Sequence, residues 1–287
     1  MSGIISSDMQ PTQVEITARF DKRPKLLSLT YIILNELIKG LLIQWSYKFN
    51  LVTDMIMLTF VFIGVTFFVG NGTLDAGQLA SALLGYIAWF YATVAINDMA
   101  YDLREEAHSG TLEQWYMSPA PAGFVQIGRT LSKFVFTTAT ISVISAVLIL
   151  IFKIHIPFRW VGLPVFGLML VGVYGFGFIV GGATLLFKQI GSLANMVQNM
   201  ILFLNGAFLP VDRFPDWLAS VAQTLPTTQG IIVLRRVVLD GRSLIDVWLD
   251  GSLLWLLIHS GVYFAVGWIV FSVCERQAKK RGLLGQY

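Results

Sequence analysis

The sequence contains little charge and almost no cysteine. Of its 287 residues 13% are charged, whereas about a quarter of a typical soluble domain is charged, and 55% are hydrophobic. This composition excludes an ordinary soluble domain and indicates a membrane protein. The single cysteine, Cys274, cannot form an intrachain disulfide framework or a thiolate metal site within one chain. We expect it to be a buried structural thiol.

Motifs for catalysis and for nucleotide binding are also missing. His108, His155 and His259 are scattered, without a metal-binding motif or a carboxylate cluster beside them, so no metal site is predicted. No G-x-x-x-x-G-K-[ST] motif occurs, so the chain has no P-loop to hold ATP phosphates. We expect no cofactor bound by this chain, and no nucleic-acid partner. A membrane-embedded enzyme would need a catalytic cluster that the sequence does not contain.

Long apolar runs are what the sequence does contain. About 20 mainly apolar residues are needed for a helix to cross the hydrocarbon of a bilayer. The fold class predicted is therefore an all-α integral membrane protein with six transmembrane helices. The predicted spans are Leu51–Val69, Leu79–Asn97, Phe134–Phe152, Trp160–Phe187, Ile190–Leu209 and Leu253–Cys274.

The segments before the first span and after the last contain more basic than acidic residues. Residues 1–27 are polar and predict a cytoplasmic tail, and residues 276–287 predict a basic cytoplasmic C-terminus. Residues 28–50 are apolar but contain Glu36 and Lys39, which would be costly inside the hydrocarbon. We therefore expect an amphipathic interfacial helix along the inner surface rather than a seventh span, and both termini in the cytoplasm.

Between the fifth and sixth spans, residues 210–241 contain two helical patterns too short to cross a membrane. Pro215 precedes the first, which contains Trp217, and Pro226 precedes the second, with Thr227 or Thr228 as cap and Gly241 at its end. These patterns predict two half-helices on the outer side. Arg235 and Arg236 lie in the second one, where they could attract an anionic headgroup, although snorkelling to the surface is the simpler expectation.

A polar segment, EEAHSGTLEQWYMSPAP, interrupts the apolar sequence at residues 105–121. Thr111 and Gln114 fit a capping box, and the helix they begin would carry an aromatic face. A resting place on lipid headgroups is less expected than a protein partner, because the anionic inner leaflet repels carboxylates. The candidate partner-contact residues are Glu105, Glu106, Gly110, Thr111, Leu112, Glu113, Trp115 and Tyr116.

Polar and aromatic side chains mark the fifth and second spans. Amides at three- and four-residue spacing would share one side of the fifth span, either as interhelical hydrogen bonds or as the lining of a substrate path or subunit junction. Aromatic residues of the second span are expected to pack toward lipid, with stacking on a substrate as the minority alternative. The candidates are Asn195, Gln198, Asn199 and Asn205 in the fifth span and Trp89 and Tyr91 in the second.

Small and acidic residues near the spans have structural interpretations. The spacing of Gly177 and Gly181 predicts close helix packing rather than a nucleotide loop. Asp54 and Asp98, at the inner ends of the first two spans, are expected to be solvated caps or partners of Lys48 and Arg104. A proton relay would require carboxylates deeper in the membrane.

The segment Gly-Thr-Leu-Glu-x-x-x-x-Ser-Pro after Glu106, together with residues 203–236 after the fifth span, resembles the membrane subunits of type 2 ABC transporters. The resemblance covers nearly the whole chain. It implies a permease domain over residues 51–275, with a coupling helix near 106–118 that sits in a cleft of a separate ATPase. By this resemblance Glu106 and residues 110–113 would contact the ATPase.

The resemblance also implies the assembly and the activity. Two permease copies, expected as a homodimer in a prokaryotic plasma membrane, would form the path, and two copies of the ATPase subunit would bind ATP and Mg. An exported drug-like or lipid-like amphiphile is expected, and a polysaccharide or lipid-linked glycan is the alternative. A secondary transporter independent of ATP is less expected, because charged relays and inverted repeats are lacking.

Overall fold

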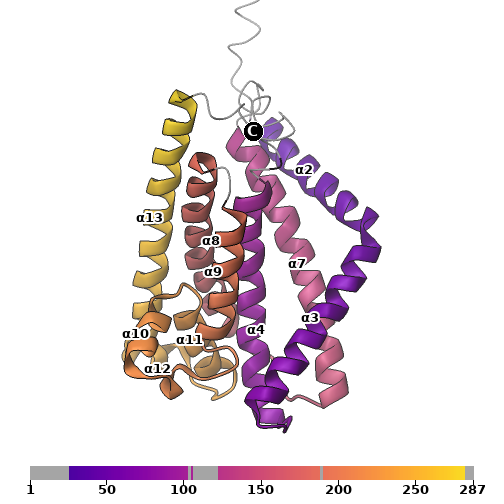
Figure 1. Ribbon diagram of the computed structural model, residues 1–287, viewed down its shortest axis with the longest axis vertical. Coiled ribbons are helices and arrows are strands. Elements are labelled where there is room, and N and C mark those ends of the chain that lie inside the picture. Colours follow the sequence, from indigo (N-terminus) through magenta and orange to yellow (C-terminus); the bar gives the residue numbers. More distant parts are fainter. Residues whose placement is uncertain (1–25, 103–104, 106–121, 188–189, 282–287) are drawn as a thin grey trace, which may run out of the picture.

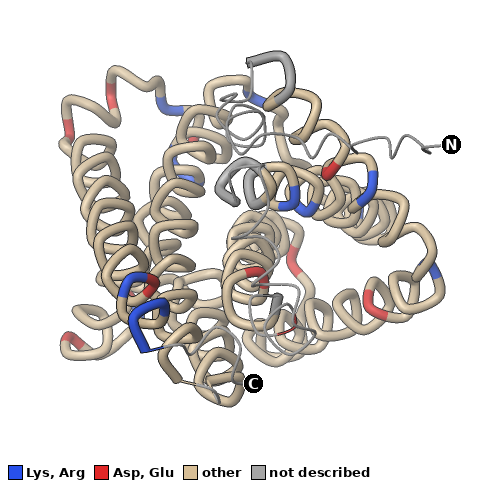
Figure 2. The backbone as a smooth tube through the Cα atoms, turned by 90° about the horizontal axis from the view of Figure 1, so that it is seen from above, with Lys and Arg blue, Asp and Glu red and all other residues tan. Residues whose placement is uncertain are grey.

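The computed structural model describes residues 26–102, 105, 122–187 and 190–281, and within these ranges the chain is helical without strands. Five helices are long and apolar enough to cross a membrane: α3 (Lys48–Val69), α4 (Ala76–Asn97), α7 (Ala122–Phe152), α8 (Gly162–Leu186) and α13 (Ser252–Lys280). Figure 2, which looks along the helices, shows that most of their residues are neither basic nor acidic. The all-α prediction and five of the six predicted spans are confirmed.

The segment predicted as the fifth span is shorter than expected. Its helix α9 (Gly191–Leu204) has 14 residues, about 21 Å at 1.5 Å per residue, which is less than the ~30 Å of hydrocarbon. The Asn205 side chain ends it by accepting a hydrogen bond from the Ala207 N–H at 2.8 Å. Gly206 follows at φ +78°, a conformation that favours glycine. The prediction of a continuous helix to Leu209 was therefore wrong, and the six-span layout is not confirmed.

The N-terminal arm, which we define as α2 (Leu26–Ser46) and α3, lies to one side of the bundle and bends at Tyr47 (Figure 1). The predicted interfacial helix thus ends before Lys48, which already belongs to α3. Helix α2 packs along the beginning of α7. Gly128 allows this approach, because a Cβ there would lie 2.8 Å from the Cβ of Glu36. The Glu36 carboxylate accepts a bond from Arg129 Nε at 3.3 Å, so α2 is also held by protein.

The packed body, which we define as α4, α8, α11 and α13, depends on small residues. A Cβ on Gly267 of α13 would lie 1.9 Å from the carbonyl oxygen of Gly175 of α8. On α8 the Cβ positions of Gly177 and Gly181 would lie within 3.2 Å of α4 and η1 atoms. The predicted role of these glycines in close packing is confirmed. Cys274 is half-buried near Gly182 on the same α8–α13 interface, so the prediction of a structural thiol fits in part.

The segment after α9 forms four short helices at one end of the bundle: η2 (Val211–Arg213), α10 (Asp216–Thr224), α11 (Thr228–Val238) and α12 (Leu244–Leu249). The two predicted half-helices are confirmed as α10 and α11. Thr227 is the N-cap of α11, but its side chain makes no capping bond. Helix α12 was missed, although Ser243 and Asp246 form a capping box.

Figure 1 places the start of α2 and the end of α13 at one end of the bundle, which we call the terminal end, and α10, α11 and α12 at the other. The chain therefore leaves and enters the described region on one side. This arrangement agrees with the prediction that both termini share a side of the membrane, while the side itself stays a prediction.

Candidate functional site

The predicted coupling segment lies mostly outside the described residues. Glu106, Gly110, Thr111, Leu112, Glu113, Trp115 and Tyr116 are all outside them, and Glu105 is an exposed helical residue. Their role therefore stays a prediction.

The described chain leading into this segment is a π-helix, η1 (Asp98–Asp102), directly after α4. The hydroxyl of Tyr101 donates to the carbonyl of Gly191, the first residue of α9, at 3.1 Å. Met99 is buried where η1 meets Gly177 and Gly181 of α8. A displacement of η1 would therefore act directly on α8 and α9, and π-helical turns are frequent at functional positions.

Asp98 is buried rather than solvated. It is 2% exposed and forms an ion pair with Lys133 of α7. The expectation of a solvated cap was therefore wrong for Asp98, and the alternative of an Arg104 partner lies outside the described residues. Its second oxygen, Oδ2, is buried without a hydrogen-bond partner in the described part of the chain. A buried carboxylate that is half satisfied is costly, so this position carries either strain or a function.

The predicted polar stripe of the fifth span does not share one environment. Gln198 is buried against α4, where its Nε2 donates to Asn97 Oδ1 at 2.6 Å. Asn205 is fully buried and serves the turn that ends α9. Asn195 and Asn199 instead line an open groove with Met196, Met200 and Phe203. A single polar lining was therefore wrong, because the helix ends before Asn205 and turns Gln198 inward.

The aromatic residues of α4 are buried within the chain rather than facing lipid. Trp89 donates from Nε1 to the carbonyl of Gln198 at 3.0 Å. The hydroxyl of Tyr91 lies 2.6 Å from Thr138 Oγ1 on α7. Lipid-facing packing is thereby contradicted for Trp89 and Tyr91, because both are buried within the chain and each polar tip joins α4 to a neighbouring helix. Stacking on a substrate stays a prediction.

Arg235 also departs from its expected orientation. Its Nη2 donates to the Ser81 carbonyl at 2.9 Å and to the Ala207 carbonyl at 2.7 Å. Burial lowers the pKa of its guanidinium to about 10. Snorkelling was therefore wrong for Arg235, which joins α11 to the start of α4 and to the turn after α9.

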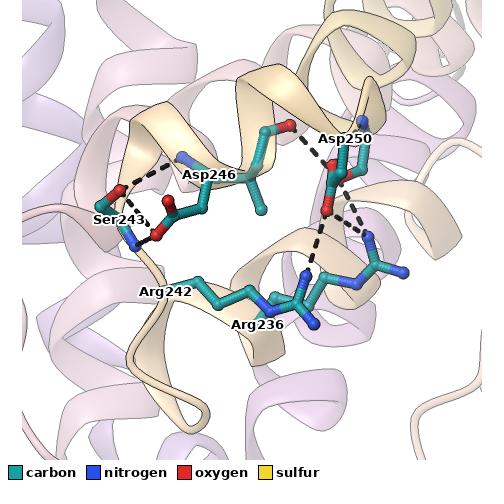
Figure 3. A network of polar contacts seen from close by, with 7 residues as sticks. Arg236, Arg242, Ser243, Asp246 and Asp250 are labelled. Carbon is teal, nitrogen blue, oxygen red and sulfur yellow. Dashed lines mark hydrogen bonds and ion pairs between the residues drawn. The ribbon is translucent and has the colours of Figure 1, made fainter.

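Arg236 belongs to an exposed polar network that Figure 3 shows. Its Nη1 donates to Asp250 Oδ2 at 3.1 Å and to Ser252 Oγ at 3.0 Å, and Arg242 reaches the same carboxylate oxygen at 3.3 Å. Hydrogen bonds from Ser252, and then the two arginines, lower the pKa of Asp250. This network ties α11 and α12 to α13. Pro215 and Trp217, the remaining candidates of the outer segment, begin α10, with the indole 69% exposed.

A cavity of about 640 Å³ lies between the N-terminal arm, α4 and α7. Asp54, Asp98 and Lys133 are among its lining residues, together with Tyr47, Phe90 and Phe136. This cavity could not be predicted from the sequence, because its lining comes from five helices: α2, α3, α4, η1 and α7. Asp54 and Asp98 were the available signal, since their placement near the inner ends of adjacent spans could bring them together. Neither cavity nor groove contains a metal-binding set, and no group of three potential metal ligands occurs in the described ranges.

Comparison with known families identifies the class of protein. The model of the ABC-2 type transporter family matches residues 29–239, which is 211 of the 287 residues. The chain therefore belongs to the ABC-2 type transporters and is similar to the membrane (permease) component of type 2 ABC transporters. This family is a membrane component of transporters and is not itself catalytic. No curated protein matches the chain.

Proposed function

We propose that this chain is the transmembrane subunit of an ATP-driven exporter in a prokaryotic plasma membrane, with both termini in the cytoplasm. The family match over residues 29–239 is the observation that carries the proposal. ATP and Mg bind to two copies of a separate ATPase subunit, with which permeases of this family normally pair. The five long apolar helices and the absence of a P-loop from the sequence support this division of labour.

Energy enters through the coupling segment at residues 106–118, which contacts the ATPase through Glu106 and Gly110 among others. The described structure supports a route onward from that contact. Tyr101 joins η1 to α9, and Met99 contacts α8. Two arrangements of these packed helices, one for each state of the ATPase, would alternate during transport.

The second permease copy binds along the exposed side of α9. Asn195 and Asn199 lie there beside Met196, Met200 and Phe203, and these three large side chains are 43–56% exposed. Exposed amides are costly against lipid, so a protein partner or a water-lined path suits this face better. We place the junction of a homodimer, with the translocation path beside it, at this groove.

The cargo class is a drug-like or lipid-like amphiphile. A polysaccharide or a lipid-linked glycan is the alternative within the same family. A secondary transporter independent of ATP is disfavoured by the family match, because members of this family normally work with an ATPase.

Transport by the reconstituted complex tests the proposal. The chain and its ATPase are co-purified into proteoliposomes, and ATP-dependent movement of a lipophilic dye is measured. Glu106→Ala and Gly110→Leu are expected to lower the rate at least tenfold while expression and membrane insertion stay normal. Asp216→Asn, at the opposite end of the bundle, is the matched control and retains transport. Wild-type transport by the purified chain without any ATPase would refute the proposal.

Cross-linking tests the proposed junction. In a Cys274→Ser background, which removes the single cysteine of the sequence, Asn199→Cys is expected to give a disulfide-linked dimer under mild oxidation. Ile258→Cys, on an exposed position of α13, is the control and is expected to stay monomeric. Dimers from the α13 position alone would place the junction on the other side of the bundle.

A further inference from the structure

The cavity between the N-terminal arm, α4 and α7 lies on a different part of the chain from the groove on α9. Residues of the bend between α2 and α3 form one wall, and residues of α4, η1 and α7 form the others. Its volume of about 640 Å³ falls within the roughly 300–1,000 Å³ of typical small-molecule sites. The cavity is therefore large enough for a drug-sized molecule within a single chain.

The charges of this cavity are unbalanced. Its ionisable lining consists of Asp54, Asp98 and Lys133, beside the phenol of Tyr47. Two carboxylates against one ammonium group leave a net charge of −1. Lys133 is already paired with Asp98, so the Asp54 carboxylate is left to define the charge that the cavity favours.

Asp98 supplies a second indication of a ligand. Oδ1 of this carboxylate is paired with Lys133, whereas Oδ2 is buried with no partner among the described residues. Because an unsatisfied oxygen of a buried carboxylate is expensive, a small shift of Asp98 that brings Oδ2 to a cationic or hydrogen-donating group in the cavity would relieve this cost. Thr93 Oγ1, also in the lining, is similarly buried without a partner.

The remaining walls suit an apolar body with a cationic head. Leu51, Met57 and Leu58 of α3 face Phe90 and Val94 of α4 across the cavity. Phe136 and Tyr47 add aromatic rings, whose faces attract cations. An amphiphile could therefore bury its apolar part against α3 and α4 and place its head near the carboxylates.

The cavity is accessible from the arm. Ile43, Tyr47 and Met57 line it and are 49%, 63% and 65% exposed. In a bilayer this opening would face the acyl chains or headgroups at the terminal end of the bundle. A molecule dissolved in the membrane could therefore enter without first passing the subunit junction.

We propose that this cavity is a binding site for a lipophilic cation, an apolar molecule with an ammonium, phosphonium or guanidinium head. This inference rests on the proposed function, since it names the chemical class of the amphiphile, and it places a loading site within each single subunit. The head lies beside the Asp54 carboxylate, and the apolar body lies against α3 and α4.

Direct binding to the purified full-length chain tests the site without any ATPase. The chain is solubilised in dodecyl maltoside, whose headgroup is uncharged, and titrated with tetraphenylphosphonium and with tetraphenylborate. These ions have nearly the same shape and opposite charges. Saturable binding of the phosphonium ion, at least tenfold tighter than that of the borate, is expected. Equal or tighter binding of the borate would overturn the proposal.

Two variants locate the binding. Asp54→Asn removes an exposed carboxylate without touching the buried pair, and is expected to weaken phosphonium binding about tenfold, corresponding to one lost charge interaction. Asp212→Asn, a carboxylate removed on the opposite end, is the matched control and leaves binding unchanged. Thr140→Trp fills the cavity and is expected to abolish binding. Unchanged binding in both cavity variants, with unaltered thermal stability, would overturn the site.

Competition distinguishes a free cation from a lipid headgroup. Dodecyltrimethylammonium is expected to displace the bound phosphonium ion, and phosphatidylethanolamine is not. Displacement by the lipid as well would support the cationic site and assign a lipid as its occupant. If phosphonium binds as expected but the reconstituted complex transports nothing with ATP, the site stands and the exporter function fails. If transport proceeds but the chain does not bind the cation, the reverse holds.

Discussion

Helices α3 and α8 are nearly equal in length and hydrophobicity, yet they differ in how much of each is buried inside the chain. Over its most apolar stretch 44% of α8 is buried inside the chain, compared with 11% of α3. The difference lies in small residues. Gly172 and Gly175 let the backbone of α13 approach α8, whereas Gly64 of α3 has no atom within 4 Å of a Cβ position. Hydrophobicity therefore determines which helices enter the membrane, whereas small residues determine which helices pack closely against one another.

The polar contacts follow the same division. The N-terminal arm reaches α7 through Glu36 and Arg129, and the cavity separates part of α3 from α4 and α7. The packed body joins its helices by backbone approach, and the buried bond from Trp89 attaches α9 to it. The loosely packed helix α3 beside a rigid body leaves room for a ligand and for movement.

Enlarging a glycine is expected to separate the two regions most strongly. Gly175→Leu places a side chain against the α13 backbone and should destabilise the fold by about 3 kcal/mol or more. Gly64→Leu on α3 meets open space and should change stability by less than about 0.5 kcal/mol. Size-exclusion profiles and thermal unfolding of the detergent-solubilised proteins measure both. Equal losses would show that α3 is packed as tightly as the body.

Removing the cation of the buried ion pair is expected to have the next largest effect. Lys133→Met leaves Asp98 buried and uncompensated, at a cost of about 3–5 kcal/mol. Lys279→Met is the matched control, because its pair with Glu275 is exposed and such pairs contribute about 0.5 kcal/mol or less. Thermal unfolding again reports the difference. A similar small loss in both variants would mean that α7 does not depend on this contact with η1.

We expect a smaller, pH-dependent effect from the exposed polar network around Asp250. The pKa of Asp250 is lowered in the folded chain from its ordinary value of 3.8. Its stabilisation is therefore fully present above that value and is lost as the pH falls through the folded pKa. Asp250→Asn should make the unfolding temperature less sensitive to pH between about 5 and about 3. Parallel curves for the wild type and the variant would show that the network does not stabilise the fold.

The sequence predicted much of this fold because span-length apolar runs and proline positions act locally. Five spans and the helices α10 and α11 were found in this way. Helix α9 was overestimated, because the Asn205 side chain and Gly206 end it inside an apolar run. The orientations of Trp89, Gln198 and Arg235 could not be predicted, since each is set by a partner more than a hundred residues away in the chain or by a turn that periodicity does not reveal.

The sequence by itself determined that this protein is a helical membrane protein without a nucleotide loop, because transfer of apolar side chains into a bilayer depends on composition and length. The tertiary structure decided which polar groups are paired, and where a cavity opens. It buried Asp98 against Lys133 and left Asp54 facing the same space. Those features depend on helices brought together across the chain, and no local pattern of residues contains them.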